Sequence, residues 1–212
     1  MPREIELKLA VPDAALAAVA AWLDANGQPC GEATLLNVYL DTPARDLARQ
    51  RAALRLRKKG SQWLQTLKTA GTSNAGLAAR NEWECEVAGE AIDLACFPEE
   101  ARAVLAPLAA QLAPVFRTDF ARRAWIVTQD GERIEAALDA GTITAPGRDN
   151  AEPIQELELE WLPGPDADSA DDTRAEAALR AFAKRLAHVA PLTPADLSKA
   201  ARGYRLIGGQ LS

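Results

Sequence analysis

Carboxylate and basic side chains alternate with apolar ones in several short segments of this 212-residue chain. Glu4, Glu6 and Lys8 share one such segment, and Glu156 and Glu158 share another. Carboxylate oxygens are the ligands that Mg²⁺ and Mn²⁺ prefer, whereas Lys and Arg donate hydrogen bonds to phosphate oxygens. Residues of these types, brought together, are typical of a site that binds divalent cations and phosphate groups.

The alternation has a period of two, which is typical of β-strands with one polar and one apolar face. The charged faces comprise Glu4, Glu6 and Lys8; Arg55 and Arg57; Thr66 and Lys68; Arg80, Glu82, Glu84 and Glu86; Glu135 and Asp139; and Glu156, Glu158 and Glu160. In a barrel each strand has an inward and an outward face. If the apolar faces pack against helices outside, the charged faces point inward, where bound cations and phosphates would cancel their repulsion.

Two other interpretations fit the same alternation. The charged faces of an ordinary sheet can point into water and form salt bridges between strands. A lipocalin-like barrel with an apolar ligand would instead need apolar side chains on the inward faces. The direction of the charged faces therefore decides between these interpretations.

The periodicity and the turn signals predict eight strands and three helices. The strands are expected at residues 4–9, 35–41, 54–58, 63–68, 80–87, 115–128, 132–138 and 154–162, and the helices at 12–25, 90–112 and 173–187, with Pro98 and Pro107 interrupting the second helix. Gly60-Ser61 and Asp130-Gly131 predict hairpin turns. Residues 71–79 read as a loop, 162–172 as a linker, and 115–128 as one strand or two. These elements predict one domain of the α+β class.

Composition excludes several classes of function. A net charge of −6, from 30 acidic and 24 basic residues, argues against a general nucleic-acid binder. Cys30, Cys85 and Cys96 have no CxxC spacing, so neither a disulfide framework nor a zinc site is expected. His188 is the only histidine, which leaves metal chemistry to carboxylates. With no apolar run of about 18 residues, we expect a cytoplasmic protein without a membrane partner.

Several motifs resemble, in the same order, those of the CYTH domain of the triphosphate tunnel metalloenzymes. They are Glu4-Ile5-Glu6-Leu7-Lys8, Leu54-Arg55-Leu56-Arg57, Thr66-Leu67-Lys68, Arg80-Asn81-Glu82, Glu135-Ala136-Ala137-Leu138-Asp139, Glu156-Leu157-Glu158-Leu159-Glu160 and Ser198-Lys199-Ala200-Ala201-Arg202-Gly203-Tyr204. The last two look most like the bacterial inorganic triphosphatase branch, in which a helical CHAD domain often follows. A longer parent chain with a CHAD domain is therefore an expectation.

The resemblance implies both a fold and a reaction. The fold is a closed antiparallel eight-stranded β-barrel that forms a tunnel, with helices packed outside, as one domain at residues 1–205 before a tail at 206–212. The reaction is hydrolysis of inorganic triphosphate (tripolyphosphate) to pyrophosphate and phosphate with Mg²⁺ or Mn²⁺. A class IV-type adenylate cyclase, a thiamine triphosphatase and a non-catalytic polyphosphate-binding module stay open as alternatives.

The resemblance also implies roles for individual residues. The implied metal ligands are Glu4, Glu6, Asp139, Glu156 and Glu158. The implied catalytic residues are Glu4, Glu6, Lys8, Glu82 and Asp139. The implied substrate-binding residues are Lys8, Arg55, Arg57, Lys68, Arg80, Arg122 and Lys199. Arg122 is preferred over Arg117 and Arg123 because alternation places those two on the opposite face of the strand.

Overall fold

The structure is a computed structural model that describes residues 3–69, 72–164 and 172–208, with the side chains of all of these except residues 3, 72–74 and 78–80. The strands are β1 (Arg3–Ala10), β2 (Gln28–Asp41), β3 (Ala53–Lys59), β4 (Gln62–Lys68), β5 (Thr72–Asn74), β6 (Leu77–Val87), β7 (Ala113–Gln129), β8 (Glu132–Thr144), β9 (Glu152–Leu162) and β10 (Thr193–Pro194). The helices are α1 (Leu16–Asn26), α2 (Asp46–Arg49), α3 (Glu99–Leu105), α4 (Asp172–Leu186) and α5 (Lys199–Leu206), with short 3-10 turns at Asp13–Ala15, Leu94–Cys96 and Ala109–Gln111.

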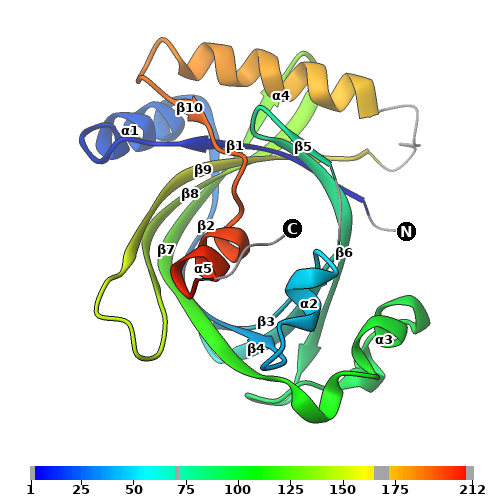
Figure 1. Cartoon of the computed structure of the whole chain (residues 1–212). Helices are drawn as coiled ribbons and strands as arrows, with labels where there is room; N and C mark the ends of the chain where they lie inside the picture. Colours follow the sequence, from blue (N-terminus) through cyan, green and yellow to red (C-terminus); the bar gives the residue numbers. More distant parts are fainter. Residues whose placement is uncertain (1–2, 70–71, 165–171, 209–212) are drawn as a thin grey trace.

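One antiparallel sheet curls around a central space (Figure 1). Its strand order is β10-β1-β9-β8-β7-β2-β3-β4-β6-β5. The β7–β8 hairpin turns at Asp130 and Gly131, whose φ angles of 53° and 85° are those that its tight turn requires. Gly60, with φ of 61°, likewise turns the chain between β3 and β4. Both predicted hairpins are confirmed.

The prediction of a closed eight-stranded barrel is wrong. Within the described residues the sheet has ten strands, with β10 and β5 at the two ends of the order. β1 also pairs with β6, but only between residues 3–7 and 77–81. Residues 82–87 of β6 pair with β4, and no described strand covers their other edge. Hydrogen bonds therefore do not close the wall along its length, because β1 meets only one end of β6.

The helices lie on both faces of the sheet: the three predicted helices pack outside, as expected, whereas α2 and α5, which were not predicted as helices, lie on the inner face. α1 and α4 cover the outer face through residues such as Leu23 and Phe182, and α3 covers the outer face of β3, β4 and β6. In Figure 1, α2 and α5 lie within the ring of strands. There Ala48 and Tyr204 pack against Phe116. The inner face is apolar at this end, which explains why two helices bury themselves there.

Two of the predicted elements differ from the structure. The helical segment expected at residues 90–112 is broken near Pro98 and Pro107, as predicted, and only α3 and two 3-10 turns of it are helical. The loop expected at residues 71–79 contains β5 and the start of β6, joined by a turn in which Ala75 and Gly76 have φ of 50° and 84°. No described helix combines the length and the apolar character needed to cross a membrane.

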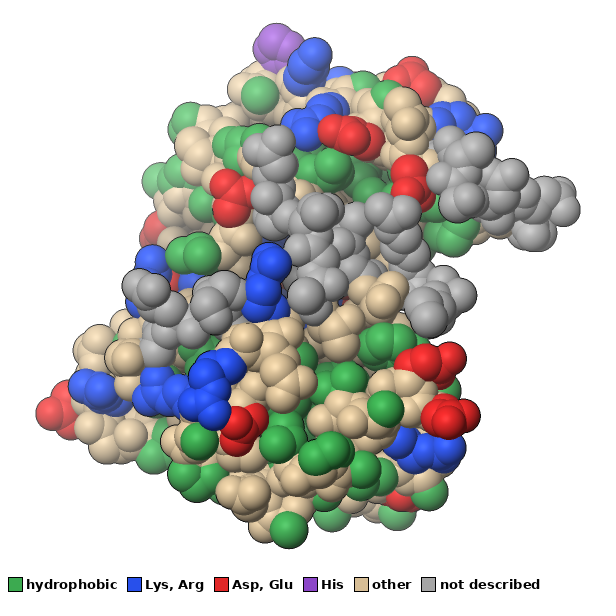
Figure 2. All heavy atoms as spheres, turned by 45° about the vertical axis from the view of Figure 1, so that its right-hand side comes forward, with side chains coloured by type: hydrophobic (Ala, Val, Ile, Leu, Met, Phe, Trp, Pro, Cys, Tyr) green, Lys and Arg blue, Asp and Glu red, His purple; other side chains and the backbone are tan. Residues whose placement is uncertain are grey.

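Alternation places the charged faces inside, as predicted. Ile5 and Leu7 of β1 belong to the outer core under α1 and α4. Glu6 and Lys8, between and after them, are only 3% and 4% exposed on the other face. The outer surface in Figure 2 shows acidic and basic side chains mixed with hydrophobic ones. The charged faces are therefore not solvated outer faces, and the inward side chains are not those of an apolar ligand pocket.

Close packing of α5 on the sheet gives a first testable prediction. A Cβ added at Gly203 would overlap the ring of Phe116. Gly203→Ala should therefore lower the free energy of unfolding by about 1–3 kcal/mol, although alanine usually favours a helix over glycine. Chemical denaturation measures the change. Gly89→Ala is the control, since its added Cβ would meet nothing within 4 Å, and equal stability of the two variants would contradict the prediction.

Candidate active site

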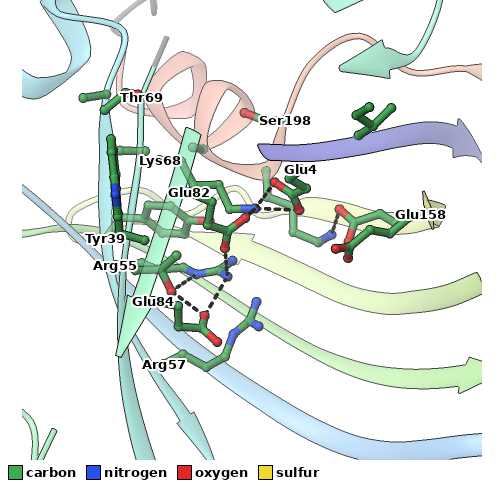
Figure 3. A pocket seen from close by; sticks show the side chains of 18 of the residues that line it. Glu4, Tyr39, Arg55, Arg57, Lys68, Thr69, Glu82, Glu84, Glu158 and Ser198 are labelled. Atoms are coloured by element: carbon green, nitrogen blue, oxygen red, sulfur yellow. Dashed lines mark hydrogen bonds and ion pairs between the residues drawn. The ribbon is translucent and has the colours of Figure 1, made fainter. Parts of the chain in front are cut away.

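Charged side chains of β1, β3, β4, β6, β7, β9 and α5 line one cavity of about 980 Å³ on the inner face of the sheet. The lining includes Glu4, Lys8, Arg55, Arg57, Lys68, Glu82, Glu84, Arg122, Glu158, Glu160 and Lys199. Figure 3 shows several of them pointing toward one another from different strands. Segments that are far apart in the sequence thus share one polar interior.

Three carboxylates meet on the β8–β9 side of this interior. Asp139 lies opposite Glu156 across the two strands, and Glu158 follows on the same face of β9. Their nearest oxygens lie within 4.8 Å of one another. Lys199 forms ion pairs with all three, and its Nζ is 2.6 Å from Asp139 Oδ2 and 3.0 Å from Glu158 Oε1. One ammonium group therefore offsets the repulsion between three acids.

Arg122 is the second cation of this acidic cluster. Its Nε and Nη2 each lie 2.7 Å from an oxygen of Asp139, and Nη2 also pairs with Glu158. Arg117 and Arg123 instead form ion pairs on more exposed parts of β7. The structure thus places Arg122 inside, as alternation predicted, while its role in substrate binding stays a prediction.

A second group of ion pairs joins β1, β3, β4 and β6. Lys68 Nζ lies 3.0 Å from Glu4 and 2.6 Å from Glu82. Arg55 Nη2 lies 3.7 Å from Glu82 and 3.6 Å from Glu84 (Figure 3). Both cations therefore already have acidic partners in the cavity wall.

Arg57 differs from these cations. Its Nε donates a hydrogen bond of 2.7 Å to Asn37 Oδ1. Within the described part of the chain, its guanidinium forms no ion pair with a carboxylate. Burial, together with the neighbouring Arg55 and Arg122, lowers the pKa of Arg57 to about 10. Arg57 therefore presents to the cavity a positive charge that the protein compensates poorly.

Lys8 of β1 lies at the same interior. Lys8 Nζ is 3.6 Å from Glu6 and 3.8 Å from Glu158. Arg80 pairs opposite Glu4 along the backbone, and its side chain lies outside the described residues. Lys8 thus links the acids of β1 to the cluster on β9.

Sequence reasoning missed two polar residues of this interior, Asn37 and Arg202. Arg202 Nε lies 2.7 Å from Glu152, and its Nη1 lies 3.0 Å from Glu156. Arg202 follows Lys199 by three positions, a spacing that places both side chains on one side of a helix. That spacing was a usable signal once this segment was recognised as helical.

The carboxylates of the site differ in pKa because nearby cations compensate some of them and not others. Burial by itself would raise the pKa of Glu158, but Lys199 and Arg122 outweigh it and hold this pKa well below its usual range. At Glu160, burial and then the nearby Glu4 raise the pKa to about 8. Glu158 is therefore ionised at neutral pH, whereas Glu160 carries a proton.

The acidic cluster fits a hard divalent cation. Asp139, Glu156 and Glu158 offer only oxygen ligands, and these lie close enough to share one ion. The other two predicted ligands lie apart from this cluster: Glu4 pairs with Lys68, and Glu6 pairs with Lys8. The structure thus brings together three of the five predicted ligands, and the ligand assignment itself stays a prediction.

Comparison with known families agrees with this arrangement. The family model described as the CYTH domain matches residues 2–204. The chain belongs to the CYTH domain family. Several of the motif residues line the cavity of the CYTH domain: Glu4, Lys8, Arg55, Arg57, Lys68, Glu82, Glu158 and Lys199. Asp139 and Glu156 lie behind them, joined to Lys199 by ion pairs, and the side chain of Arg80 is not described.

Related proteins share sequence or fold with this CYTH domain. An inorganic triphosphatase from Haemophilus influenzae is 33% identical over 175 residues, which cover 80% of this chain and 45% of that protein. The chain thus spans about half the length of this relative. A protein from Hippeastrum, studied as an adenylyl cyclase and described with a dominant triphosphatase activity, has a TM-score of 0.67, 21% identity, and coverage of 97% and 96%. A Pyrococcus horikoshii OT3 protein has a TM-score of 0.59, 16% identity, and coverage of 93% and 96%. The structural neighbours support the fold.

The ion pairs of Lys199 lead to a second prediction. In EDTA, Lys199→Met should lower the free energy of unfolding by about 3 kcal/mol, because three acids lose a shared buried cation. Mn²⁺ should then raise the melting temperature of the variant more than that of the wild type, since no ammonium competes for the carboxylates. Thermal unfolding with increasing Mn²⁺ measures both effects. The exposed Lys184→Met is the control, and equal shifts for Lys199→Met and wild type would contradict the prediction.

Glu160 supplies a third prediction, on pH dependence. Glu160 lies between Glu6 and Glu135 across the strands, and its pKa is raised from 4.5 to about 8. The folded state keeps a proton that the unfolded state releases above pH 4.5, so stability falls as pH rises toward 8. In EDTA, Glu160→Gln should have the same free energy of unfolding as the wild type near pH 4.5. Near pH 8, its free energy of unfolding should exceed that of the wild type by about 1–3 kcal/mol. A stability difference independent of pH would contradict this.

Proposed function

We propose that this CYTH domain hydrolyses inorganic triphosphate to pyrophosphate and phosphate with Mg²⁺ or Mn²⁺. The observation that carries the proposal is that a cluster of three carboxylates reaches the cavity through Glu158, and that Arg57, which has no carboxylate ion pair among the described residues, lines the same cavity. Such a cavity has places for cations and for an anion at once. The relative with 33% identity is named an inorganic triphosphatase, which supports the proposal.

We assign the cations to the carboxylate side of the cavity. The proposed ligands are Glu4, Glu6, Asp139, Glu156 and Glu158. A bound divalent cation supplies positive charge at the phosphate oxygens and so eases nucleophilic attack on phosphorus. Lys199 must leave Asp139 and Glu156 when these acids act as ligands, which makes its ammonium group available to a phosphate oxygen.

We assign the phosphate groups to the basic side chains. The proposed contacts are Lys8, Arg55, Arg57, Lys68, Arg80, Arg122 and Lys199. Arg57 loses no ion pair with a described carboxylate when it binds phosphate, so its contact with the anion costs less than those of Arg55 and Lys68. Arg55 and Lys68 exchange part of their contact with Glu82 for phosphate oxygens.

The chemical step is an in-line displacement. A water oxygen attacks the terminal phosphorus while the bond from that phosphorus to the bridging oxygen breaks. The proton of the water passes to a carboxylate, for which the proposed catalytic acids Glu4, Glu6, Glu82 and Asp139 are the candidates. Lys8 stabilises the negative charge that develops on the leaving pyrophosphate.

The remaining predictions about the whole protein stay proposals. They are a cytoplasmic location, the absence of nucleic-acid and membrane partners, and a CHAD domain in a longer parent chain. The rival activities are those of a class IV-type adenylate cyclase and of a thiamine triphosphatase. A non-catalytic polyphosphate-binding module is the rival from another class of function.

A substrate panel separates these activities. Phosphate release from tripolyphosphate, ATP and thiamine triphosphate is measured with Mg²⁺ and with Mn²⁺, and cyclic AMP is measured with ATP. We expect tripolyphosphate to give the highest kcat/KM. Cyclic AMP as the dominant product would overturn the proposal, as would tight binding of tripolyphosphate without turnover under either cation.

Two variants then test the two sides of the cavity. Glu156→Gln should lower kcat for tripolyphosphate by at least about 100-fold, because a metal ligand loses its charge. Arg57→Ala should raise KM by about tenfold, because a charged donor to phosphate is removed. Arg117→Ala, an exposed arginine of β7, is the matched control and should leave both constants unchanged. Arg57→Ala with the same KM as Arg117→Ala would contradict the assignment of Arg57.

A further inference from the structure

The contact of Arg57 with Asn37 separates this arginine from the other arginines of the cavity. Asn37 is wholly buried on β2, between β3 and β7. Its Oδ1 accepts from Arg57 Nε at 2.7 Å, and its Nδ2 donates to the backbone oxygen of Thr118 at 2.7 Å. The three residues stand opposite one another in adjacent strands. The amide is thus held at both of its ends.

The amide meets two demands at this position. It offers an acceptor to the guanidinium and a donor to the backbone carbonyl, whereas a carboxylate offers acceptors only and an aliphatic side chain offers neither. An amide is also neutral. Arg55 and Arg122 are held by carboxylates that offset their charge, but Asn37 holds Arg57 without offsetting it.

The hydrogen bond to Asn37 also fixes the orientation of the Arg57 guanidinium. With Nε bonded to Asn37, the other nitrogens of Arg57 remain for a ligand, and Arg57 lines the cavity (Figure 3). Arg55 and Arg122 both carry positive charge close enough to affect Arg57. Repulsion from these two groups would move an unanchored Arg57 side chain away from them and out of the common anion site.

We propose that Asn37 is a positioning residue that holds Arg57 in the cavity through a neutral contact in place of a carboxylate ion pair, ready for a phosphate group of the substrate. This inference rests on the proposed function, because it takes Arg57 to be a phosphate-binding residue. Asn37 itself touches no substrate in this scheme. It acts by fixing the direction of a charged donor before the anion arrives, which lowers the entropy lost on binding.

Gln65 provides a matched control on the neighbouring part of the sheet. It is also a wholly buried amide, and its Nε2 donates to the backbone oxygen of Asp93 at 2.6 Å. Gln65 also contacts Cys85 and does not line the cavity. Gln65→Ala therefore removes a comparable buried amide without touching Arg57.

The experiment measures binding of a non-hydrolysable imido-bridged triphosphate in Mg²⁺ by calorimetry, together with kcat and KM for tripolyphosphate. The variants are Asn37→Ala, Asn37→Ser, Arg57→Ala, Asn37→Ala with Arg57→Ala, and Gln65→Ala. We expect Asn37→Ala and Asn37→Ser to weaken binding by about three- to tenfold and to raise KM more than they lower kcat. The double variant should bind no more weakly than Arg57→Ala, because both changes remove one coupled contact.

The outcomes separate the inference from the proposed function. If Arg57→Ala weakens binding but both Asn37 variants bind like Gln65→Ala, the positioning role is wrong and the proposed function stands. If the effects of Asn37→Ala and Arg57→Ala add fully, Asn37 does not act through Arg57 and the inference fails. If Arg57→Ala itself leaves binding unchanged, the assignment of Arg57 under the proposed function is wrong as well. If Asn37→Ala folds poorly, Asn37→Ser provides the same test.

Discussion

Compensation of buried charge is the constraint on which this structure depends. Asp139 has no exposed surface, and Glu156 is only 2% exposed. Carboxylates removed from water at this depth are costly unless cations and hydrogen bonds surround them. Lys199, Arg122 and Arg202 supply that compensation from α5 and β7. The curled sheet and the helix inside it are therefore parts of one electrostatic arrangement.

Compensation is uneven across the cavity, and that unevenness makes the site suitable for ligands. The acids on β8 and β9 share cations that a stronger, divalent ion can displace. Arg57 on β3, by contrast, has a neutral partner in Asn37 and no carboxylate ion pair among the described residues. A fully matched set of ion pairs would stabilise the fold but would leave no excess charge for a substrate. An active site needs this remaining imbalance, which explains why strongly shifted groups gather here.

The sequence predicted the inward faces because alternation is a local property. Because side chains alternate along a strand, Glu6 and Lys8 share one face of β1. Ile5 and Leu7 form the other face, which packs against the outer helices. The pattern also selected Arg122 over Arg123. Once the direction of one side chain in a strand is known, the alternation gives the direction of every other side chain in that strand.

Other features of the fold depend on distant contacts and escaped prediction. The meeting of β1 with only part of β6 depends on where two strands cross in space, which no local pattern records. The inner position of α5 depends on the shape of Phe116, which lies far from it in the sequence. Asn37 was missed because a single buried amide has no periodic signal, and its partners, Arg57 and Thr118, come from two other strands.

A single carboxylate, Asp41, connects the two inner helices, α2 and α5, to β2. Its oxygens accept from the backbone nitrogens of Leu47 and Ala48 in α2, at 2.9 and 3.1 Å. Tyr204 of α5 donates its hydroxyl to the same carboxylate at 2.7 Å, and burial together with this contact raises the pKa of Tyr204.

Tyr204 and Lys199 lie on the same short helix, so the bond to Asp41 at one end helps to set the ammonium group at the other. Asp41 is wholly buried on β2, the strand that also carries Asn37. One strand therefore positions two cations by different means: Arg57 through a direct neutral contact, and Lys199 through the docking of α5. Because both depend on β2, a shift of this strand would move Lys199 and Arg57 together.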